Sequence, residues 1–446
     1  MTPPDLVVRA RRAWVGGALR EADLLVTDGR IAAIGVPTPP DVPVVELADD
    51  EVLLPGLVDS HVHVNEPGRT HWEGFASATR AAAAGGVTTL VDMPLNSIPP
   101  TTTVAALDAK RAATAGKLSV DVAFWGGAVP GNLGALGPLH AAGVRGFKAF
   151  LTPSGVDEFG HLDADQLELA LAEVAALRSV LIVHAEDPAD LHADGALGGR
   201  YADFLASRPA VSERHAIGRV IDAMRRTGAR AHVLHLSDAG SLDLVRSAKA
   251  EGLPLTVETC PHYLALRAED VPEAATQFKC CPPIRDAANQ DLLWDAVLDG
   301  TVDAIVSDHS PSTADLKSGD FGLSWGGIAG LQLGLSVVWT EARRRGVPLE
   351  RLLPLFTTGP ARVAGLAGLG ELAVGAPAHL VAFAPDDERV VDVHRLEHRN
   401  PVSPYDGATV AGAVRTVWLH GSPVVQGGAV TAPGTGRVLL PEVARA

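Results

Sequence analysis

Cysteine, aromatic residues and positive charge are all scarce in this 446-residue chain. Its three cysteines, Cys260, Cys280 and Cys281, are odd in number and two are adjacent, which excludes a disulfide framework and is typical of a reduced, cytoplasmic protein. Aromatic residues make up only 4% of the chain, so Ala, Gly, Val and Leu must pack most of the core. The 37 Lys and Arg residues face 53 Asp and Glu, and the net charge of −16 argues against a nucleic-acid partner or an anionic membrane surface.

Long apolar runs are also missing from the sequence. No stretch approaches the roughly 20 apolar residues that a membrane-spanning helix needs. The first residues, Met1-Thr-Pro-Pro-Asp-Leu, lack the charged-then-apolar order of a secretory signal. We therefore expect a cytoplasmic protein with no membrane partner.

The apolar residues that are present suffice for a large core, since they form 47% of the chain against 20% charged residues. Between residues 53 and 376, strand-like segments alternate with helix-like ones. Eight segments are apolar runs typical of buried strands, namely the one that opens at Leu54 and those at 87–94, 120–125, 144–151, 180–186, 231–237, 255–260 and 302–308. Eight strand–helix units predict an α/β fold, a closed (β/α)8 TIM-type barrel.

The two ends of the chain differ from the barrel region in their sequence pattern. Short strands separated by glycine turns occupy both ends, and Asp28-Gly29 between two apolar runs is a hairpin signal. We expect the ends to meet in one small β-sandwich domain, because strand edges left unpaired are costly. The predicted division is 1–52 and 377–446 for the two parts of the small domain and 53–376 for the barrel.

Within the barrel region, one segment is predicted to be a helix and another a long loop. Asp163 precedes residues whose apolar positions recur at helical spacing, which predicts a helix capped by Asp163. The stretch 187–213 is predicted as a long loop over the top of the barrel.

Two histidines stand where the opening strand ends. His61 and His63 are one residue apart, so on a strand both imidazoles project from the same face and suit one metal ion. The alternative is a pair of histidines satisfied at a strand edge. In such barrels, active groups sit at the carboxyl ends of the strands. The ends of five strands together predict a metal site built from four imidazoles, a lysine and a carboxylate: His61, His63, Lys148, His184, His235 and Asp308.

Lys148 lies in the apolar segment Gly146-Phe-Lys-Ala-Phe, where an unpaired ammonium would be costly to bury. A protonated lysine cannot bind a metal. Carbon dioxide added to the neutral amine gives a carbamate (N6-carboxylysine), whose two oxygens can bridge two cations. The alternative is an ion pair between Lys148 and Asp308 or another carboxylate.

Other candidate ligands compete with this set. His232 faces away from His235 on a regular strand, and His235 is closer to the strand end, so His235 is the predicted ligand. His262 either binds the metal or forms hydrogen bonds within its loop. The pair Cys280-Cys281 indicates packing or a substrate-loop backbone, since no second thiol pair lies nearby.

Six motifs together resemble the cyclic amidohydrolases, a family that includes dihydroorotases, hydantoinases (dihydropyrimidinases) and allantoinases. They are His61-Val-His63 with Glu66-Pro-Gly, Gly85-Gly-Val-Thr-Thr-Leu-Val-Asp-Met-Pro, Gly146-Phe-Lys-Ala-Phe, His184-Ala-Glu-Asp, Glu258-Thr-Cys-Pro-His-Tyr and Ser307-Asp-His-Ser-Pro. The resemblance covers nearly the whole chain and implies a small β domain split between its ends and a homotetramer.

The resemblance also implies a centre of two divalent metal ions, zinc or else cobalt, manganese or nickel. His61 and His63 would hold one ion together with Asp308. His184 and His235 would hold the other, and carbamylated Lys148 would bridge the two.

Four further motifs are most similar to the allantoinases: Asn65-Glu-Pro-Gly-Arg-Thr-His-Trp-Glu-Gly-Phe, Met93-Pro-Leu-Asn-Ser-Ile-Pro-Pro-Thr-Thr, Ser324-Trp-Gly-Gly-Ile-Ala-Gly-Leu-Gln and Asn400-Pro-Val-Ser-Pro-Tyr. This implies hydrolysis of the cyclic amide of (S)-allantoin, a small neutral ureide, to allantoate in purine degradation. A metal-bridged hydroxide would attack, and Asp308 would be the catalytic proton carrier. The predicted substrate contacts are Asn65, Asn96, Cys281, Gly326 and Gly327.

Two residues depart from the family patterns. Dihydroorotases have an arginine where Asn65 stands, so a carboxylate-bearing substrate would lose its bidentate partner. Many allantoinases have a cysteine where Ser312 stands, which removes any role for that thiol. The competing functions are a hydantoinase or dihydropyrimidinase with the same metal ligands, and a non-catalytic scaffold of the hydantoinase-like type.

Overall fold

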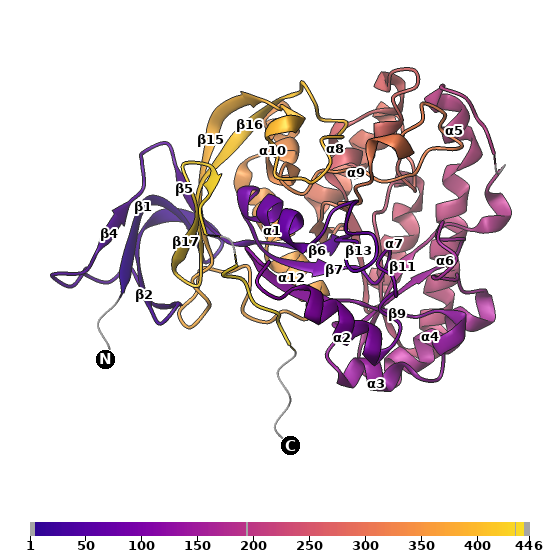
Figure 1. Ribbon diagram of the computed structural model, residues 1–446, viewed down its shortest axis with the longest axis horizontal. Coiled ribbons are helices and arrows are strands. Elements are labelled where there is room, and N and C mark those ends of the chain that lie inside the picture. Colours follow the sequence, from indigo (N-terminus) through magenta and orange to yellow (C-terminus); the bar gives the residue numbers. More distant parts are fainter. Residues whose placement is uncertain (1–4, 193–194, 433, 441–446) are drawn as a thin grey trace.

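A computed structural model describes residues 5–192, 195–432 and 434–440. Figure 1 shows two bodies side by side, a barrel surrounded by helices and a smaller β sheet. The prediction that the first residues carry no secretory signal concerns a segment whose residues 1–4 lie outside the described residues.

The barrel consists of parallel strands in two hydrogen-bonded arcs. The first arc contains β6 (Leu57–Val62), β7 (Val87–Asp92) and β8 (Asp121–Phe124). The second contains β9 (Gly126–Gly127), β10 (Phe147–Phe150), β11 (Val180–His184), β12 (Arg230–Val233), β13 (Leu255–Thr259) and β14 (Ala304–Ile305). Backbone hydrogen bonds join the arcs on both sides, from Arg145 N to Phe124 O (2.9 Å) and from His63 N to His309 O (2.8 Å). The predicted TIM-type barrel is thereby confirmed, with β9 as a short additional strand.

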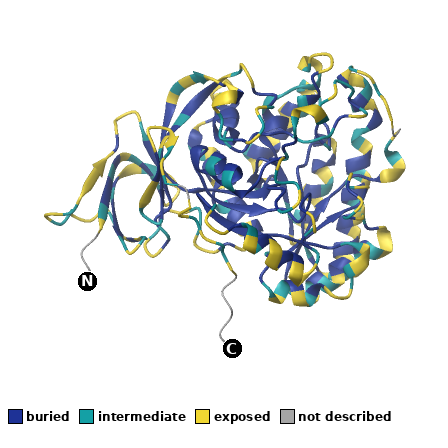
Figure 2. Ribbon diagram, viewed as in Figure 1, coloured by how far each residue is buried: buried dark blue, intermediate teal, exposed yellow. Residues whose placement is uncertain are grey.

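Helices cover the outside of the barrel, and the strands that they enclose are buried (Figure 2). They are α1 (Phe75–Ala84), α2 (Val104–Ala113), α3 (Leu136–Ala141), α4 (Ala164–Ala176), α5 (Tyr201–Ser207), α6 (Ala210–Thr227), α7 (Leu242–Ala250), α8 (Pro261–Ala265), α9 (Ala287–Asp299), α10 (Gly334–Arg344), α11 (Leu353–Phe356) and α12 (Thr358–Val363). Within the described residues, none of these helices is both long and apolar enough to cross a membrane.

The helix predicted after Asp163 is α4, and its first turn explains why it starts there. The Asp163 carboxylate accepts a hydrogen bond from Gln166 N (2.9 Å), and the Gln166 side chain accepts one from Asp163 N (3.1 Å). This reciprocal capping satisfies two backbone donors that would otherwise lack partners. The helix then buries Leu167, Ala170, Leu171 and Val174, the apolar stripe of the sequence pattern.

The two ends of the chain meet in one nine-stranded sheet. Its strands are β1 (Leu6–Val15), β2 (Ala18–Thr27), β3 (Arg30–Ile34), β4 (Val44–Glu46), β5 (Val52–Pro55), β15 (Leu380–Val390), β16 (Thr409–Leu419), β17 (Ser422–Gln426) and β18 (Ala429–Val430). The join is at β5, which pairs with β1 on one side and β15 on the other. The strands expected in a sandwich thus form one sheet, here called the end-built sheet, in which eight strands follow one path and β4 pairs with β1 beside it. The boundaries 1–52, 53–376 and 377–446 stay predictions.

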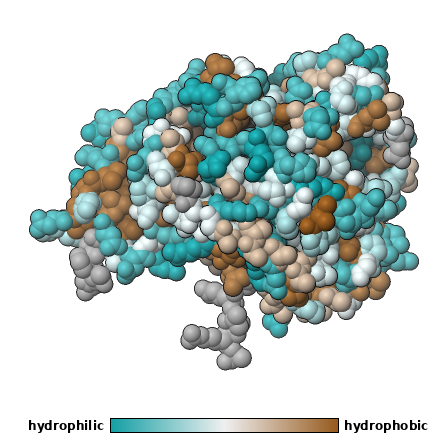
Figure 3. Space-filling view, viewed as in Figure 1, coloured by the Kyte–Doolittle hydropathy of each residue, from teal (hydrophilic) through white to brown (hydrophobic). Residues whose placement is uncertain are grey.

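The end-built sheet has a core of its own and an apolar outer region. Val8, Leu24 and Trp418 belong to a cluster that is separate from the barrel core. Figure 3 shows hydrophobic side chains gathered over the sheet at the left of the molecule. Val44 and Val45 of β4 are among the exposed apolar residues, at 42% and 39% exposure.

Candidate active site

The predicted ligands converge at the carboxyl ends of the barrel strands. His61 is in β6, Lys148 in β10 and His184 at the end of β11. His63 directly follows β6, whereas His235 and Asp308 lie in the loops just after β12 and β14. All six side chains are buried: His61, His63, Lys148, His184, His235 and Asp308. Parallel strands bring their carboxyl ends to one rim of a barrel, so residues far apart in sequence meet here.

The distances connect these side chains into one cluster. His61 Nε2 lies 3.1 Å from Asp308 Oδ1, and His63 Nε2 lies 3.7 Å from the same oxygen. Lys148 Nζ lies 3.4 Å from His61 Nε2. On the other side, His184 Nδ1 lies 3.1 Å from His235 Nε2. The structure therefore brings together every residue of the predicted ligand set, in the two histidine pairs that the resemblance implied.

Three residues at this rim have a left-handed backbone. The φ angles are 64° at Asn65, 35° at His235 and 43° at Asp308. Residues other than glycine rarely adopt this region, and each instance costs about 1–3 kcal/mol, which the surrounding structure must offset. Such costs concentrate at functional sites, because they hold side chains in one orientation.

The outer nitrogen of each of three imidazoles is held by an acceptor. His61 Nδ1 lies 2.6 Å from a Glu258 oxygen, and His63 Nδ1 lies 2.9 Å from the carbonyl oxygen of Leu95. His184 Nε2 lies 2.7 Å from a Glu186 oxygen. Each acceptor receives a hydrogen bond from the outer N–H, so the proton stays on the outer nitrogen and the lone pair is on the nitrogen that faces the cluster. This is the arrangement that a metal-binding histidine requires.

Burial sets the charge of the cluster. It lowers the pKa of His184 and lowers those of His63 and His235 well below the usual value, so these imidazoles are neutral at pH 7. Burial would raise the pKa of Asp308, but His61 and the other imidazoles outweigh it and hold that pKa well below its usual range. Burial would lower the pKa of His61, but Asp308 and Glu258 outweigh it and raise that pKa. The three neutral imidazoles and the ionised carboxylate form a donor set that fits divalent cations of the zinc type.

Lys148 has the surroundings that its proposed modification needs. Burial lowers the pKa of its ammonium from 10.5 to about 8, against the opposing effect of Asp308 and Glu258. Its Nζ lies over the Phe150 ring, 4.9 Å from the centroid. Among the described residues, Lys148 forms no ion pair with a carboxylate, so the geometry does not favour the alternative interpretation as an Asp308 partner.

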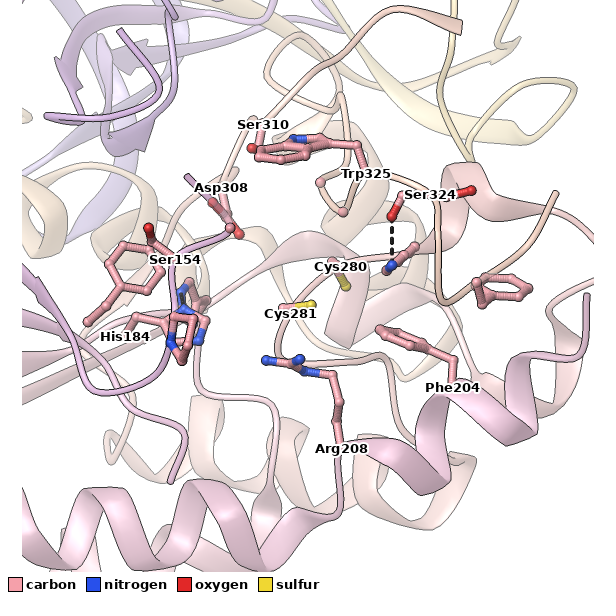
Figure 4. A pocket seen from close by; sticks show the side chains of 18 of the residues that line it. Ser154, His184, Phe204, Arg208, Cys280, Cys281, Asp308, Ser310, Ser324 and Trp325 are labelled. Atoms are coloured by element: carbon pink, nitrogen blue, oxygen red, sulfur yellow. Dashed lines mark hydrogen bonds between the residues drawn. The ribbon is translucent and has the colours of Figure 1, made fainter. Parts of the chain in front are cut away.

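A cavity of about 310 Å³ opens onto the cluster, a volume suited to a small ligand. Four of the five predicted substrate contacts line it: Asn96, Cys281, Gly326 and Gly327. Asn65 does not; it is buried behind the wall, where its side-chain oxygen accepts a hydrogen bond from Asn96 Nδ2 (3.2 Å). In Figure 4, Asp308 and His184 lie at the left, Cys281 and Arg208 lie in the middle, and Phe204 lies at the right.

The competing ligands occupy different positions. His232 lies 2.9 Å from Glu258 Oε2 and 2.8 Å from Thr256 Oγ1, so both of its nitrogens have protein partners and His235 is left facing the cluster. His262 is buried, and neither of its nitrogens has a hydrogen-bond partner within the described chain. A nitrogen of His262 lies within 4.8 Å of an Asp308 oxygen, which places this imidazole next to the ligand set without exposing it to the cavity.

The sequence patterns did not predict two acidic residues and an arginine that lie at the site. Glu258 and Glu186 each fix an imidazole, and Arg208 binds both oxygens of Glu186, at 3.0 and 2.5 Å. Both acidic residues belong to motifs shared with the cyclic amidohydrolases, Glu258-Thr-Cys-Pro-His-Tyr and His184-Ala-Glu-Asp, and these motifs could have indicated them. No sequence motif indicated Arg208, although it lines the cavity.

Comparisons with known proteins agree with this geometry. Residues 52–424 match the amidohydrolase family. The chain is 55% identical to an allantoinase of Streptomyces avermitilis, over 99% of this chain and all of that protein. It is 44% identical to the allantoinase of Saccharomyces cerevisiae, over 83% and 82% of the two chains.

Solved structures of related enzymes have the same fold. The L-hydantoinase (dihydropyrimidinase) of Arthrobacter aurescens superposes with a TM-score of 0.92 at 30% identity, over 98% of this chain and all of that one. A dihydropyrimidinase of Brevibacillus agri gives 0.88 at 26% identity, over 99% of both chains. The chain therefore belongs to the amidohydrolase family and, within it, groups with the allantoinases.

Proposed function

We propose that this protein hydrolyses the cyclic amide of (S)-allantoin to allantoate, a step of purine (allantoin) degradation. The observation that carries the proposal is the convergence of six buried donor groups beside a cavity of about 310 Å³. The 55% identity to an allantoinase over nearly the whole chain supports the choice of ring.

The activity is proposed to depend on two divalent metal ions, with zinc as the leading candidate. His61 and His63 would hold one ion with Asp308, His184 and His235 would hold the other, and the carbamate of Lys148 would lie between them. When bound, such ions lower the pKa of water toward about 7 and polarise the amide carbonyl. The neutral imidazoles and the ionised Asp308 support this assignment, because they offer lone pairs and a negative charge to cations.

The protein's own contribution is proton transfer and positioning. Asp308 would accept the proton of the attacking water and deliver it to the ring nitrogen that leaves. The Asn96 amide and the backbone of Gly326 would offer donors and acceptors to a neutral ureide ring. Gly327 would line the ring only, because its N–H donates to Lys279 O (2.8 Å) and its oxygen accepts from Lys317 Nζ (2.9 Å). Asn65 supports this wall by its hydrogen bond with Asn96 rather than from within the cavity.

A comparison of ring substrates tests the proposed function. We expect (S)-allantoin to be turned over with a kcat/KM at least about tenfold above those of hydantoin and dihydrouracil, on enzyme whose metal content has been measured. Hydantoin is the most informative alternative substrate, because the fold matches that of an L-hydantoinase with a TM-score of 0.92. Preference for hydantoin or dihydrouracil would overturn the choice of allantoin.

The competing function is a non-catalytic scaffold, which would be favoured if protein purified without chelator held no metal. A homotetramer and a cytoplasmic location both stay predictions. Size measurement in solution would test the tetramer.

A further inference from the structure

A second group of metal-binding side chains lies at the opposite end of the barrel. Asp121 is the first residue of β8, and the predicted active site is at the other ends of the strands. His379 immediately precedes β15, and His420 lies in the turn between β16 and β17. The group therefore spans the contact between the base of the barrel and the end-built sheet. The predicted function makes no use of it.

The donor atoms of this group are close together and enclosed. His420 Nε2 lies 3.0 Å from Asp121 Oδ2, and His379 Nε2 lies 3.6 Å from the same oxygen. Asp121 and His379 are 1% and 5% exposed in their side chains, and His420 is 18% exposed. One donor atom from each residue can be chosen so that all three lie within 4.8 Å of one another.

One atom of this group lacks a partner. Asp121 Oδ1 accepts hydrogen bonds from Arg437 N (2.9 Å) and from His420 Nε2 (3.2 Å). Asp121 Oδ2 is buried with no hydrogen-bond partner among the described residues, although two imidazole nitrogens approach it. An unpaired carboxylate oxygen is costly to bury, so a further partner at this point would stabilise it.

The spacing and the chemistry of the donors fit a zinc-class cation. Tetrahedral zinc with bonds of about 2.0–2.1 Å places neighbouring ligand atoms roughly 3.3–3.4 Å apart, between the two measured separations. Burial lowers the pKa of His379 to about 4, so its imidazole is neutral and can offer a lone pair at pH 7. His420 has a left-handed backbone with φ 49°, a conformation that has to be stabilised by its surroundings.

We propose that Asp121, His379 and His420 form a structural metal site that binds one divalent cation of the zinc class. The cation joins three segments: the start of a barrel strand, the entry to β15 and the turn after β16. Arg437 N also donates a hydrogen bond to Asp121, so the site contacts the C-terminal segment as well. In that segment, Leu439 N donates to Val122 O of β8 (2.8 Å). The role of the site is to hold the end-built sheet against the barrel.

Metal counting tests this site. Wild-type protein and His420→Asn are equilibrated with Zn²⁺, freed of loosely bound metal and analysed for zinc. We expect His420→Asn to hold one zinc per chain fewer, with allantoin turnover within about twofold of wild type. The control His394→Asn, which changes an exposed histidine, should lose none. Equal zinc in His420→Asn and wild type would overturn the proposal and leave a hydrogen-bonded triad in its place.

Two measurements guard against misfolding and against confusion with the active site. His379→Gln, which keeps a neutral polar side chain, should lose the same single zinc. Zinc-soaked crystals of the wild type should give an anomalous peak between Asp121 and His420, and its absence at saturating zinc would refute the site. The anomalous peak is located at the second site itself and depends on neither the metal content nor the activity of the predicted catalytic centre.

Discussion

The carboxylate of Glu258 lies 2.6 Å from His61 Nδ1, and both side chains are fully enclosed below the ligand cluster. The other Glu258 oxygen lies 2.9 Å from His232 Nε2. Burial raises the pKa of Glu258, but the two imidazoles outweigh it and lower that pKa to about 2, so Glu258 is ionised. An ionised Glu258 keeps the proton on His61 Nδ1 and leaves His61 Nε2 free to bind a cation.

Glu258→Gln tests this role. The amide must donate through one atom and can no longer accept from both imidazoles, so we expect metal affinity and turnover to fall by about 10- to 100-fold. Metal retention during dialysis against a graded chelator series measures the affinity. Glu269→Gln, on an exposed segment, serves as the control. A variant that retains metal as the wild type does would show that His61 needs no partner at Nδ1.

Asp308→Asn separates proton transfer from metal binding. The amide keeps an oxygen toward His61 but cannot accept a proton, so we expect metal to remain largely bound while kcat falls by about 10²- to 10⁴-fold. Metal analysis and steady-state kinetics on the same preparation give both quantities. The exposed Asp315→Asn, a few residues along the chain, should behave as wild type. Near-normal turnover in Asp308→Asn would remove Asp308 as the proton carrier.

Lys148→Ala tests the carbamate. We expect metal occupancy to fall and a small carboxylate such as acetate to restore part of it, because acetate can supply the missing oxygens. Lys249→Ala removes a lysine from α7 and should change neither quantity. If metal content in Lys148→Ala is intact without acetate, no bridge from this residue is needed.

The lowered pKa of Lys148 predicts that formation of the carbamate depends on pH. With a pKa of about 8 instead of 10.5, a far larger share of the amine is neutral at pH 8 and can react with carbon dioxide. Reconstitution of metal-free protein with Zn²⁺ at a fixed concentration of dissolved carbon dioxide should therefore quicken as the pH rises from 7 to 9. A rate that falls or stays level over this range would contradict the carbamate.

A buried histidine near the site predicts a loss of stability in acid. Burial, aided by His309, lowers the pKa of His398 to about 3, whereas an unfolded histidine titrates near 6.5. Below about pH 6.5 the histidine is protonated in the unfolded chain but stays neutral in the native protein. The free energy of unfolding therefore falls as the pH falls toward 3. We expect His398→Gln to lose about 2 kcal/mol less stability than wild type between pH 7 and pH 5, by urea unfolding. Parallel pH profiles of the two proteins would show that His398 does not contribute.

Much of the fold could be predicted because local patterns agree with the final structure. The cap at Asp163 and the apolar stripe of α4 are both local, and the strand ends that carry His61 and Asp308 follow from the eight apolar segments. Alternation on a strand was enough to place His61 and His63 together. The metal and substrate roles of these residues stay predictions.

The remainder depends on tertiary contacts that no local pattern reveals. Glu258 meets His61 across 197 positions of sequence, and only the closed barrel brings them together. Asn65, predicted to touch the substrate, instead lies behind Asn96, where its left-handed backbone aims it. The stretch 187–213, predicted as a loop, contains α5 and the start of α6, apart from 193–194, which the structure does not describe. α5 has only seven residues and Pro209 separates it from α6, so the stretch shows no single long helical pattern.

Removal and return of the metal tests the central claim most directly. Protein stripped by a chelator is assayed for hydrolysis of (S)-allantoin before and after Zn²⁺ and bicarbonate are restored. We predict that stripped protein retains less than roughly 1% of its turnover and that restored metal returns most of it, since the amide needs activated water and a polarised carbonyl. Full turnover of allantoin by metal-free protein would contradict the account.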